Sequence, residues 1–129
     1  MADKLILVDT SILIDFYRKT NKANSAWMAL VRQEYEFAIS VISKFEIYSG
    51  ATTSQLTFWD SVLQRITVFP FDEKTVDKAV DINKELKRKR KQIDIPDLFI
   101  AATAVQFQIP PATLNWKHFA RIDGLVVIE

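Results

Sequence analysis

The sequence predicts an α/β protein built on a parallel β-sheet with helices on both faces. Short apolar runs alternate with longer stretches of helical periodicity along the chain, which is the pattern of parallel strands joined by helices. Within the first run, Lys4–Asp9, the middle residues are continuously apolar, as expected of a strand buried on both faces. The 129 residues, 49% of them hydrophobic, are enough for a single domain with a sizeable core, which we expect to span residues 1–129.

The composition excludes several kinds of site. Without cysteine the chain has no disulfide, no thiolate metal site and no cysteine nucleophile, and one histidine is too few for a multi-histidine metal site. The formal net charge of +1 means that any surface attractive to nucleic acid must be local. No apolar run approaches the roughly 20 residues of a membrane span, and the start of the chain lacks a signal-peptide pattern. We therefore expect a cytoplasmic protein without a membrane segment.

The first half of the chain alternates between strand and helix. Short strands are expected at Phe37–Ile39 and Thr67–Phe69. One helix should begin at Ser40 as its N-cap and stop at Gly50. Helical periodicity predicts helices over residues 12–17, 24–32, 40–50 and 53–66.

The second half continues the alternation with a long helix over residues 72–90. One of its faces, which extends toward Arg90, is marked by Val76, Ala79, Val80, Asn83 and Leu86. Short strands are expected at Ala112–Leu114 and Leu125–Ile128, with one helical turn, Trp116–Phe119, between them.

The chain is organised around the helix expected from Pro96 onward. Pro96 suits the first turn, where its missing N–H has no helical partner to lose. Asp97 follows near the positive end of the helix dipole, and the residues after it are almost all apolar or small, which is typical of a buried helix. A carboxylate where a core helix begins is costly unless something pairs with it. Asp97 is therefore either a helix-capping acid or a metal ligand or catalytic group.

Further polar residues are expected at the same edge of the sheet. Asp9 ends the first strand, Asn115 follows the strand expected at 112–114, and Glu46 lies in the helix after the second strand. Ligands bind at the carboxyl edge of open parallel sheets, so these residues and Asp97 are expected to share a site. A set of oxygen ligands suits Mg²⁺ or Mn²⁺, and such an ion removes the repulsion between converging carboxylates. It also activates water and stabilises charge on a phosphodiester.

Several of these residues also have an ordinary structural interpretation. Glu46 suits a solvated helix position, and His118 suits a surface or half-buried histidine because no acid pattern marks it as a triad member. Six of the eight residues in Lys84–Lys91 are basic, which is usual for the solvated end of a helix. Because that run leads directly toward Asp94 and Asp97, a phosphate-binding surface is the alternative.

Four segments resemble the four motifs of PIN-domain ribonucleases, and more narrowly those of the VapC-like toxins of bacterial toxin–antitoxin pairs. They are Val8–Asp15, Ser43–Gly50, Asp97–Ala104 and Thr113–Phe119. The first and third are the most specific, and the likeness covers essentially the full chain. The resemblance implies a PIN-like parallel sheet with helices on both faces. It implies an endoribonuclease that hydrolyses RNA phosphodiester bonds with Mg²⁺ or Mn²⁺, forms a homodimer and is blocked by a cognate antitoxin.

The resemblance also assigns roles by position. Asp9, Glu46 and Asp97 match the family's acidic metal ligands, and Asn115 completes the expected catalytic set. Asn115 stands where the family has Asp or Asn, and His118 stands where many relatives carry Asp before a Phe. The chain therefore lacks the fourth carboxylate, which puts a second metal ion in doubt, and we expect Asp94 to have a surface role rather than to replace it. Thr10, Ser11 and Thr113 are expected to contact substrate. Independently of the resemblance, the basic run is expected to help hold the RNA backbone, through Lys87, Arg88, Lys89, Arg90 and Lys91.

Two other functions compete with the nuclease. The missing fourth carboxylate favours a catalytically weak PIN-like module that binds RNA or protein without cutting, whereas the three intact acids argue against it. A hydrolase or phosphatase of another parallel-sheet fold lacks an obvious nucleophile motif. For contacts with a second chain, we expect exposed aromatic side chains, and the candidates are Trp27, Tyr48, Phe58 and Trp59.

Overall fold

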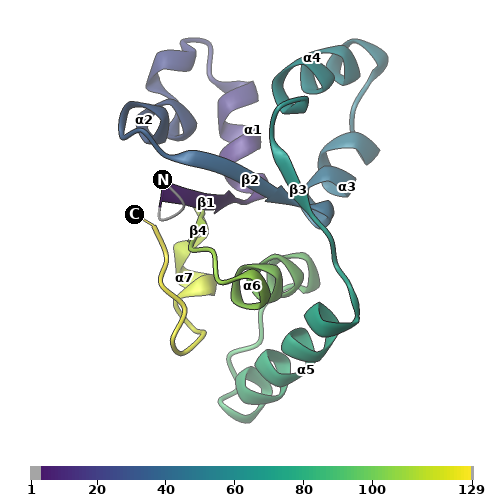
Figure 1. Cartoon of the computed structure of the whole chain (residues 1–129), viewed down its shortest axis with the longest axis vertical. Helices are drawn as coiled ribbons and strands as arrows, with labels where there is room; N and C mark the ends of the chain where they lie inside the picture. The colour runs from purple at the N-terminus through teal and green to yellow at the C-terminus, as the bar shows by residue number, and fades with distance from the viewer. Residues whose placement is uncertain (1–3, 129) are drawn as a thin grey trace.

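The computed structural model describes residues 4–128, in which a four-stranded sheet lies between two groups of helices (Figure 1). The strands are β1 (Leu5–Val8), β2 (Glu36–Ser40), β3 (Thr67–Phe69) and β4 (Pro111–Ala112). The helices are α1 (Thr10–Arg18), α2 (Ala26–Arg32), α3 (Val41–Ser49), α4 (Thr53–Leu63), α5 (Glu73–Arg88), α6 (Ile95–Phe107) and α7 (Trp116–Phe119), with a 3₁₀ turn, η2 (Lys22–Asn24), before α2. The predicted alternation of strands and helices is confirmed.

All four strands run parallel, in the order β3-β2-β1-β4. Two predicted strands are shorter than expected. The chain leaves β4 after Ala112, and the backbone N–H of Leu114 donates to the Ser11 hydroxyl instead of to a strand. The strand expected at 125–128 is reduced to one bridge between Ile128 and Ala112, since Leu125 uses its N–H in a turn.

Side chains of the two central strands alternate between two cores. Ile6 and Val8 of β1 pack with Ile39 of β2 against α1, α2, α3 and α4. Leu7 and Ala38 point the other way, toward α5, α6 and α7. All five residues are fully buried, so helices cover both faces of the sheet, as predicted (Figure 1).

Short polar side chains fix where two helices begin. The carboxylate of Asp9 caps α1, which therefore begins at Thr10, two residues earlier than the apolar pattern predicts. Ser40 caps α3 by accepting from the N–H of Ile42 at 2.8 Å, and Gly50 follows its last residue, as predicted. These caps start α1 and α3 directly after β1 and β2, at the carboxyl edge of the sheet.

Helix α6 is the buried helix that the sequence predicts. It begins at Ile95 with Pro96 in its first turn, and six of its residues are buried. Ala102 and Leu98 pack against Ala79 of α5, where the small side chains allow the two helices to lie close together. Although α6 is almost wholly apolar, neither it nor any other helix between residues 4 and 128 is long and apolar enough to span a membrane.

The predicted apolar face of α5 is partly wrong. Val76 and Val80 are 46% and 44% exposed, whereas Thr75, Ala79 and Leu86 are buried. The helix turns Ala79 and Leu86 toward α6, and this rotation brings Thr75 inside and leaves the two valines at the surface.

The aromatic residues expected to be exposed lie in or against the core. Trp27 and Trp59 are 7% and 4% exposed, and Tyr48 and Phe58 are partly buried beside them. The ring of Phe58 lies 5.0 Å from that of Trp59 and 5.1 Å from that of Tyr17, so α1 and α4 share an aromatic cluster. The prediction that these residues are exposed contacts for a second chain is therefore wrong for both tryptophans.

Candidate active site

The four predicted catalytic residues line one open pocket of about 280 Å³ at the carboxyl edge of the sheet. Its walls come from the start of α1, from α3, from the start of α6 and from α7. It is lined by Asp9, Thr10, Ser11, Ile14, Glu46, Asp94, Pro96, Asp97, Asn115 and His118. The pocket thus brings together all four residues that the sequence nominates as catalytic.

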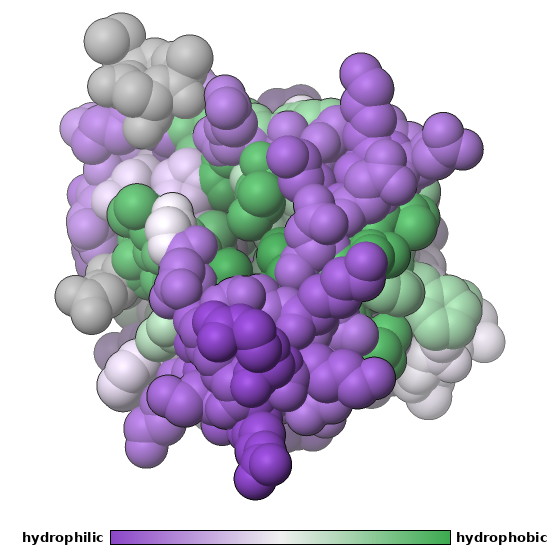
Figure 2. All heavy atoms as spheres, turned by 90° about the horizontal axis from the view of Figure 1, so that it is seen from below, coloured by the Kyte–Doolittle hydropathy of each residue, from purple (hydrophilic) through white to green (hydrophobic). Residues whose placement is uncertain are grey.

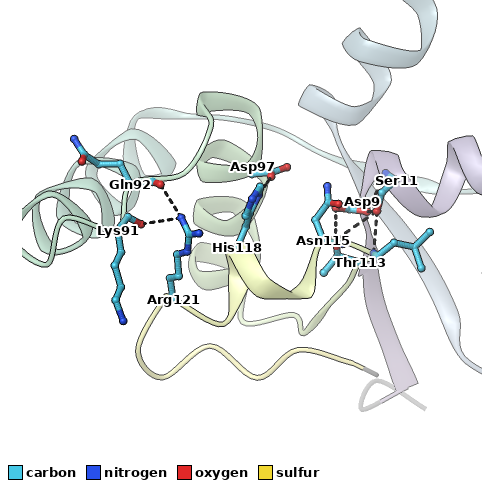
Figure 3. Close-up of polar contacts among 10 residues, drawn as sticks. Asp9, Ser11, Lys91, Gln92, Asp97, Thr113, Asn115, His118 and Arg121 are labelled. Carbon is cyan, nitrogen blue, oxygen red and sulfur yellow. Dashed lines mark hydrogen bonds and ion pairs between the residues drawn. The ribbon is translucent and has the colours of Figure 1, made fainter.

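Asp9 is the most enclosed of these carboxylates, with 1% of the residue exposed. Its Oδ1 accepts from the N–H groups of Ser11 and Ile12 and from the Ser11 hydroxyl, while Oδ2 accepts from Thr113 Oγ1 at 2.6 Å (Figure 3). Burial raises the pKa of Asp9, these hydrogen bonds oppose the rise, and the Asp97 carboxylate adds to it. Asp9 is therefore a firmly oriented acid that resists carrying its charge, and a nearby cation would relieve that cost.

Glu46 reaches the pocket from α3 and is held by the first residue of α1. Thr10 Oγ1 donates to Glu46 Oε1 at 2.6 Å and lies 3.0 Å from the hydroxyl oxygen of buried Ser43. Glu46 is partly buried and bonded, so it is not a freely solvated helix residue.

Asp97 lies in the first turn of α6, and its partner is a histidine. Its Oδ2 is 2.8 Å from His118 Nδ1 on α7 (Figure 3). Among residues 4–128 it makes no hydrogen bond to a helix N–H, so it does not act as a cap through its side chain. His118 is not among the site residues predicted from the sequence. Its place in the fourth motif, where many relatives carry an acid, is the feature that could have identified it.

Asn115 and Asp94 line the pocket with fewer constraints. Asn115 stands at the start of α7 without a side-chain capping bond, and its N–H donates to Thr113 Oγ1 at 2.9 Å. Asp94 precedes α6, is exposed and makes no capping bond either.

The predicted basic contacts lie outside this pocket. Arg88 pairs with Glu85 on the same helix, and Lys89 pairs with Asp123 at 2.7 Å, so part of the basic run is already neutralised. Lys87 and Arg90 are exposed at the end of α5. The face that includes this region is largely hydrophilic (Figure 2).

The chemistry of the pocket suits a hard divalent cation. Asp9, Glu46 and Asp97 supply carboxylate oxygens and Asn115 an amide oxygen, which are ligands that Mg²⁺ and Mn²⁺ accept. As the side chains of residues 4–128 stand, no three acidic or histidine residues are grouped closely enough to hold one ion. Each of the three carboxylates is instead turned to a hydroxyl or imidazole partner of its own.

Comparison with known sequences finds matches along almost the full chain. The sequence model of the PIN domain matches residues 6–125. Ribonuclease VapC10 of Mycobacterium tuberculosis (strain ATCC 25618 / H37Rv) is 32% identical over 121 residues, which cover 94% of this chain and 90% of the relative. Ribonuclease VapC of Rickettsia bellii (strain RML369-C) is 33% identical over 132 residues, which cover 95% of this chain and 94% of the relative.

Comparison with solved structures finds the same architecture. A toxin–antitoxin complex from Klebsiella pneumoniae contains a chain with a TM-score of 0.75 and 29% identity, covering 95% of this chain and 96% of that one. A DNA-bound VapBC structure from Salmonella typhimurium has a TM-score of 0.84 at 23% identity, over 95% of this chain and 96% of that one, and its likeness concerns the fold alone. The chain therefore belongs to the PIN-domain family and, within it, to the VapC-like ribonuclease toxins.

Proposed function

We propose that this protein is an endoribonuclease toxin that hydrolyses RNA phosphodiester bonds with a bound Mg²⁺ or Mn²⁺ ion. The observation that carries the proposal is the convergence of Asp9, Glu46, Asp97 and Asn115 in one pocket of a PIN-domain sheet. Relatives that are about one third identical over nearly the full chain and are named ribonucleases support it.

Asp9, Glu46 and Asp97 are the proposed metal ligands, and Asn115 is the uncharged member of the catalytic set. When bound, the ion supplies an activated water and stabilises negative charge on the scissile phosphate. The buried Asp9 is the most firmly oriented ligand, because its two oxygens accept from Ser11 at the start of α1 and from Thr113 directly after β4.

The hydroxyl residues beside the acids have two proposed tasks. Thr10, Ser11 and Thr113 each donate to a carboxylate, which fixes the orientation of that carboxylate. Thr10 and Ser11 also line the pocket, where they are proposed to contact the RNA. The basic residues Lys87, Arg88 and Arg90 are proposed to hold the RNA backbone farther from the scissile bond.

Two protein partners are part of the proposal. A cognate antitoxin would cover the site, in keeping with the toxin–antitoxin complex from Klebsiella pneumoniae to which this chain is 29% identical. A second copy of this chain would form a homodimer.

The decisive experiment incubates the purified chain with end-labelled single-stranded RNAs in Mn²⁺, in Mg²⁺ and in excess chelator. We expect cleavage with either ion, none with chelator, and recovery when Mn²⁺ is restored. A DNA oligonucleotide of the same base sequence serves as the substrate control.

RNA that is retained on a filter but never cut, in either metal, would contradict the proposal. That result would instead support the PIN-like binding module without catalysis. Cleavage that continues unchanged in chelator would contradict the metal dependence alone.

A further inference from the structure

The single histidine of the chain lies in the candidate active site and contacts one of the proposed metal ligands. His118 Nδ1 is 2.8 Å from Asp97 Oδ2, with 36% of the histidine side chain and 15% of the Asp97 side chain exposed. As a metal ligand Asp97 is a carboxylate, which only accepts hydrogen bonds, so its role assigns the donor in this contact to Nδ1. Hydrogen bonds to a charged group are among the stronger ones in proteins.

Two residues that follow His118 hold its helix, α7, in place. Its neighbour Phe119 is fully buried in the core that α6 shares with β1. Two residues further on, Arg121 donates to the carbonyl oxygen of Gln92 at 2.9 Å, in the loop that leads into α6 (Figure 3). These two anchors hold the backbone of α7, which carries His118, beside the start of α6.

The hydrogen bond occupies one oxygen of Asp97 and one nitrogen of His118. Among residues 4–128, Asp97 Oδ1 and His118 Nε2 have no hydrogen-bond partner. Both residues line the pocket with Asp9 and Glu46. Asp97 thus keeps one free oxygen in a site where both oxygens of Asp9 are already held.

We propose that His118 is a positioning residue for Asp97, holding Oδ2 so that Oδ1 is presented to the metal ion. This inference rests on the proposed function, because it assigns Asp97 to the metal. It also explains how the chain can use a histidine at position 118, where many relatives carry an aspartate. The imidazole orients an existing ligand, whereas a carboxylate would add negative charge beside Asp97.

Groups that orient a metal ligand without touching the metal typically contribute about 10- to 100-fold to metal affinity. We therefore expect His118→Ala to weaken Mn²⁺ binding at least about tenfold, measured from the electron paramagnetic resonance signal of free Mn²⁺. Lys117→Ala is the matched control, since this neighbour on α7 is exposed and its ammonium group lies over the Trp116 ring.

Two conservative variants separate positioning from general packing. The amide nitrogen of an asparagine lies at the distance from the backbone that Nδ1 has, whereas that of a glutamine reaches the place of Nε2. We expect His118→Asn to restore Mn²⁺ affinity to near the wild-type value and His118→Gln to remain as weak as His118→Ala.

The lone histidine also gives a direct spectroscopic readout. Long-range ¹H–¹⁵N spectra of the wild-type chain without metal should show an imidazole protonated at Nδ1 in its neutral form. Asp97→Asn should shift these ring signals, and Asp77→Asn on the exposed side of α5 should not.

Wild-type Mn²⁺ affinity in folded His118→Ala would overturn the inference, as would equal affinities of the asparagine and glutamine variants. If His118→Ala does not fold, the difference in Mn²⁺ affinity between His118→Asn and His118→Gln still tests the positioning role. A wild-type chain that neither binds Mn²⁺ nor cuts RNA would refute the proposed function itself. A wild-type chain that does both, with every His118 variant binding Mn²⁺ equally well, would refute the positioning role alone.

Discussion

Each of the three acids proposed as metal ligands, Asp9, Glu46 and Asp97, has a hydrogen-bond donor of its own, and that donor decides which substitution the fold tolerates. For Asp97 the donor is the N–H at Nδ1 of His118. The amide oxygen of an asparagine accepts the same bond, and asparagine is also well suited to the start of a helix. A neutral oxygen nevertheless holds a divalent cation less firmly than a carboxylate does.

Asp97→Asn should therefore abolish RNA cleavage while leaving the fold intact. The free energy of unfolding should change by about 1 kcal/mol or less, because asparagine keeps a hydrogen bond to His118 and is itself favoured at a helix start. Thermal unfolding with and without Mn²⁺ checks this, and the variant should no longer gain stability from the ion. Cleavage at the original rate by the folded variant would refute the catalytic assignment of Asp97.

Asp9 should behave differently, because burial makes its negative charge unfavourable in the folded chain. Folding raises the pKa of Asp9 through burial, so the folded chain holds this proton more firmly than the unfolded chain. The contribution of Asp9 to stability therefore falls as pH rises from the ordinary value of 3.8 through the raised pKa. An asparagine accepts from Ser11 and Ile12 and donates to Thr113, which keeps these hydrogen bonds without the charge.

We predict that Asp9→Asn raises the melting temperature of the metal-free protein near neutral pH and abolishes cleavage. The gain should disappear well below pH 3.8, where Asp9 is protonated in both states. Melting curves in chelator across this pH range measure the difference. A variant that is less stable than the wild type at neutral pH would contradict the prediction.

At the scale of elements, the sequence predicts most of what positions the site. Apolar runs mark the strands, Ser40 and Gly50 mark the ends of α3, and Pro96 marks the first turn of α6. Each of these signals is local, acting within one or two turns of chain.

What the sequence does not predict depends on packing between distant segments. Val76 and Val80 are exposed because of the way α5 packs on α6. Helical periodicity alone does not predict which side of α5 faces α6. The bond between Asp97 and His118 joins residues 21 apart on two helices, and only the fold brings them together.

The end of α5 gives a prediction at this scale. Arg88 already pairs with Glu85, so its substitution should affect RNA binding less than that of Lys87 or Arg90, which are exposed. The double variant Lys87→Gln/Arg90→Gln should weaken binding of single-stranded RNA. The slope of log affinity against log salt should flatten by about 0.7 for each phosphate that the variant no longer neutralises.

The matched control changes the same amount of charge at the other end of the same helix. Lys74→Gln/Lys78→Gln removes two exposed positive charges near the start of α5, and we expect an unchanged salt slope. Equal salt slopes for the two double variants would show that the basic run is only the solvated end of a helix and does not contact RNA.

At the scale of the whole molecule, the site exists only when the sheet is complete. The bond from Thr113 to Asp9 spans 104 residues of sequence and ties the end of β4 to the end of β1. Glu46 and Asp97 arrive from helices on opposite faces of that sheet. No contiguous segment of the chain therefore carries the site by itself.

The predicted homodimer is also a property of the whole molecule. Trp27 and Trp59 are buried within one chain, so they cannot supply its interface directly. Other large apolar side chains remain at the surface, including Phe45 at 69% and Val126 at 71% exposed, and exposed apolar area is typical of surfaces that bind another protein.

Light scattering of the purified chain at micromolar concentration should give about 30 kDa, twice the 14.9 kDa of one chain. Because Trp59 belongs to the core, Trp59→Ala should lower the free energy of unfolding by about 3–5 kcal/mol, while the fraction that remains folded keeps the mass of two chains. A wild-type mass of one chain at this concentration would refute the homodimer. Dissociation of folded Trp59→Ala into single chains would show that the buried aromatic cluster also supports the interface between chains.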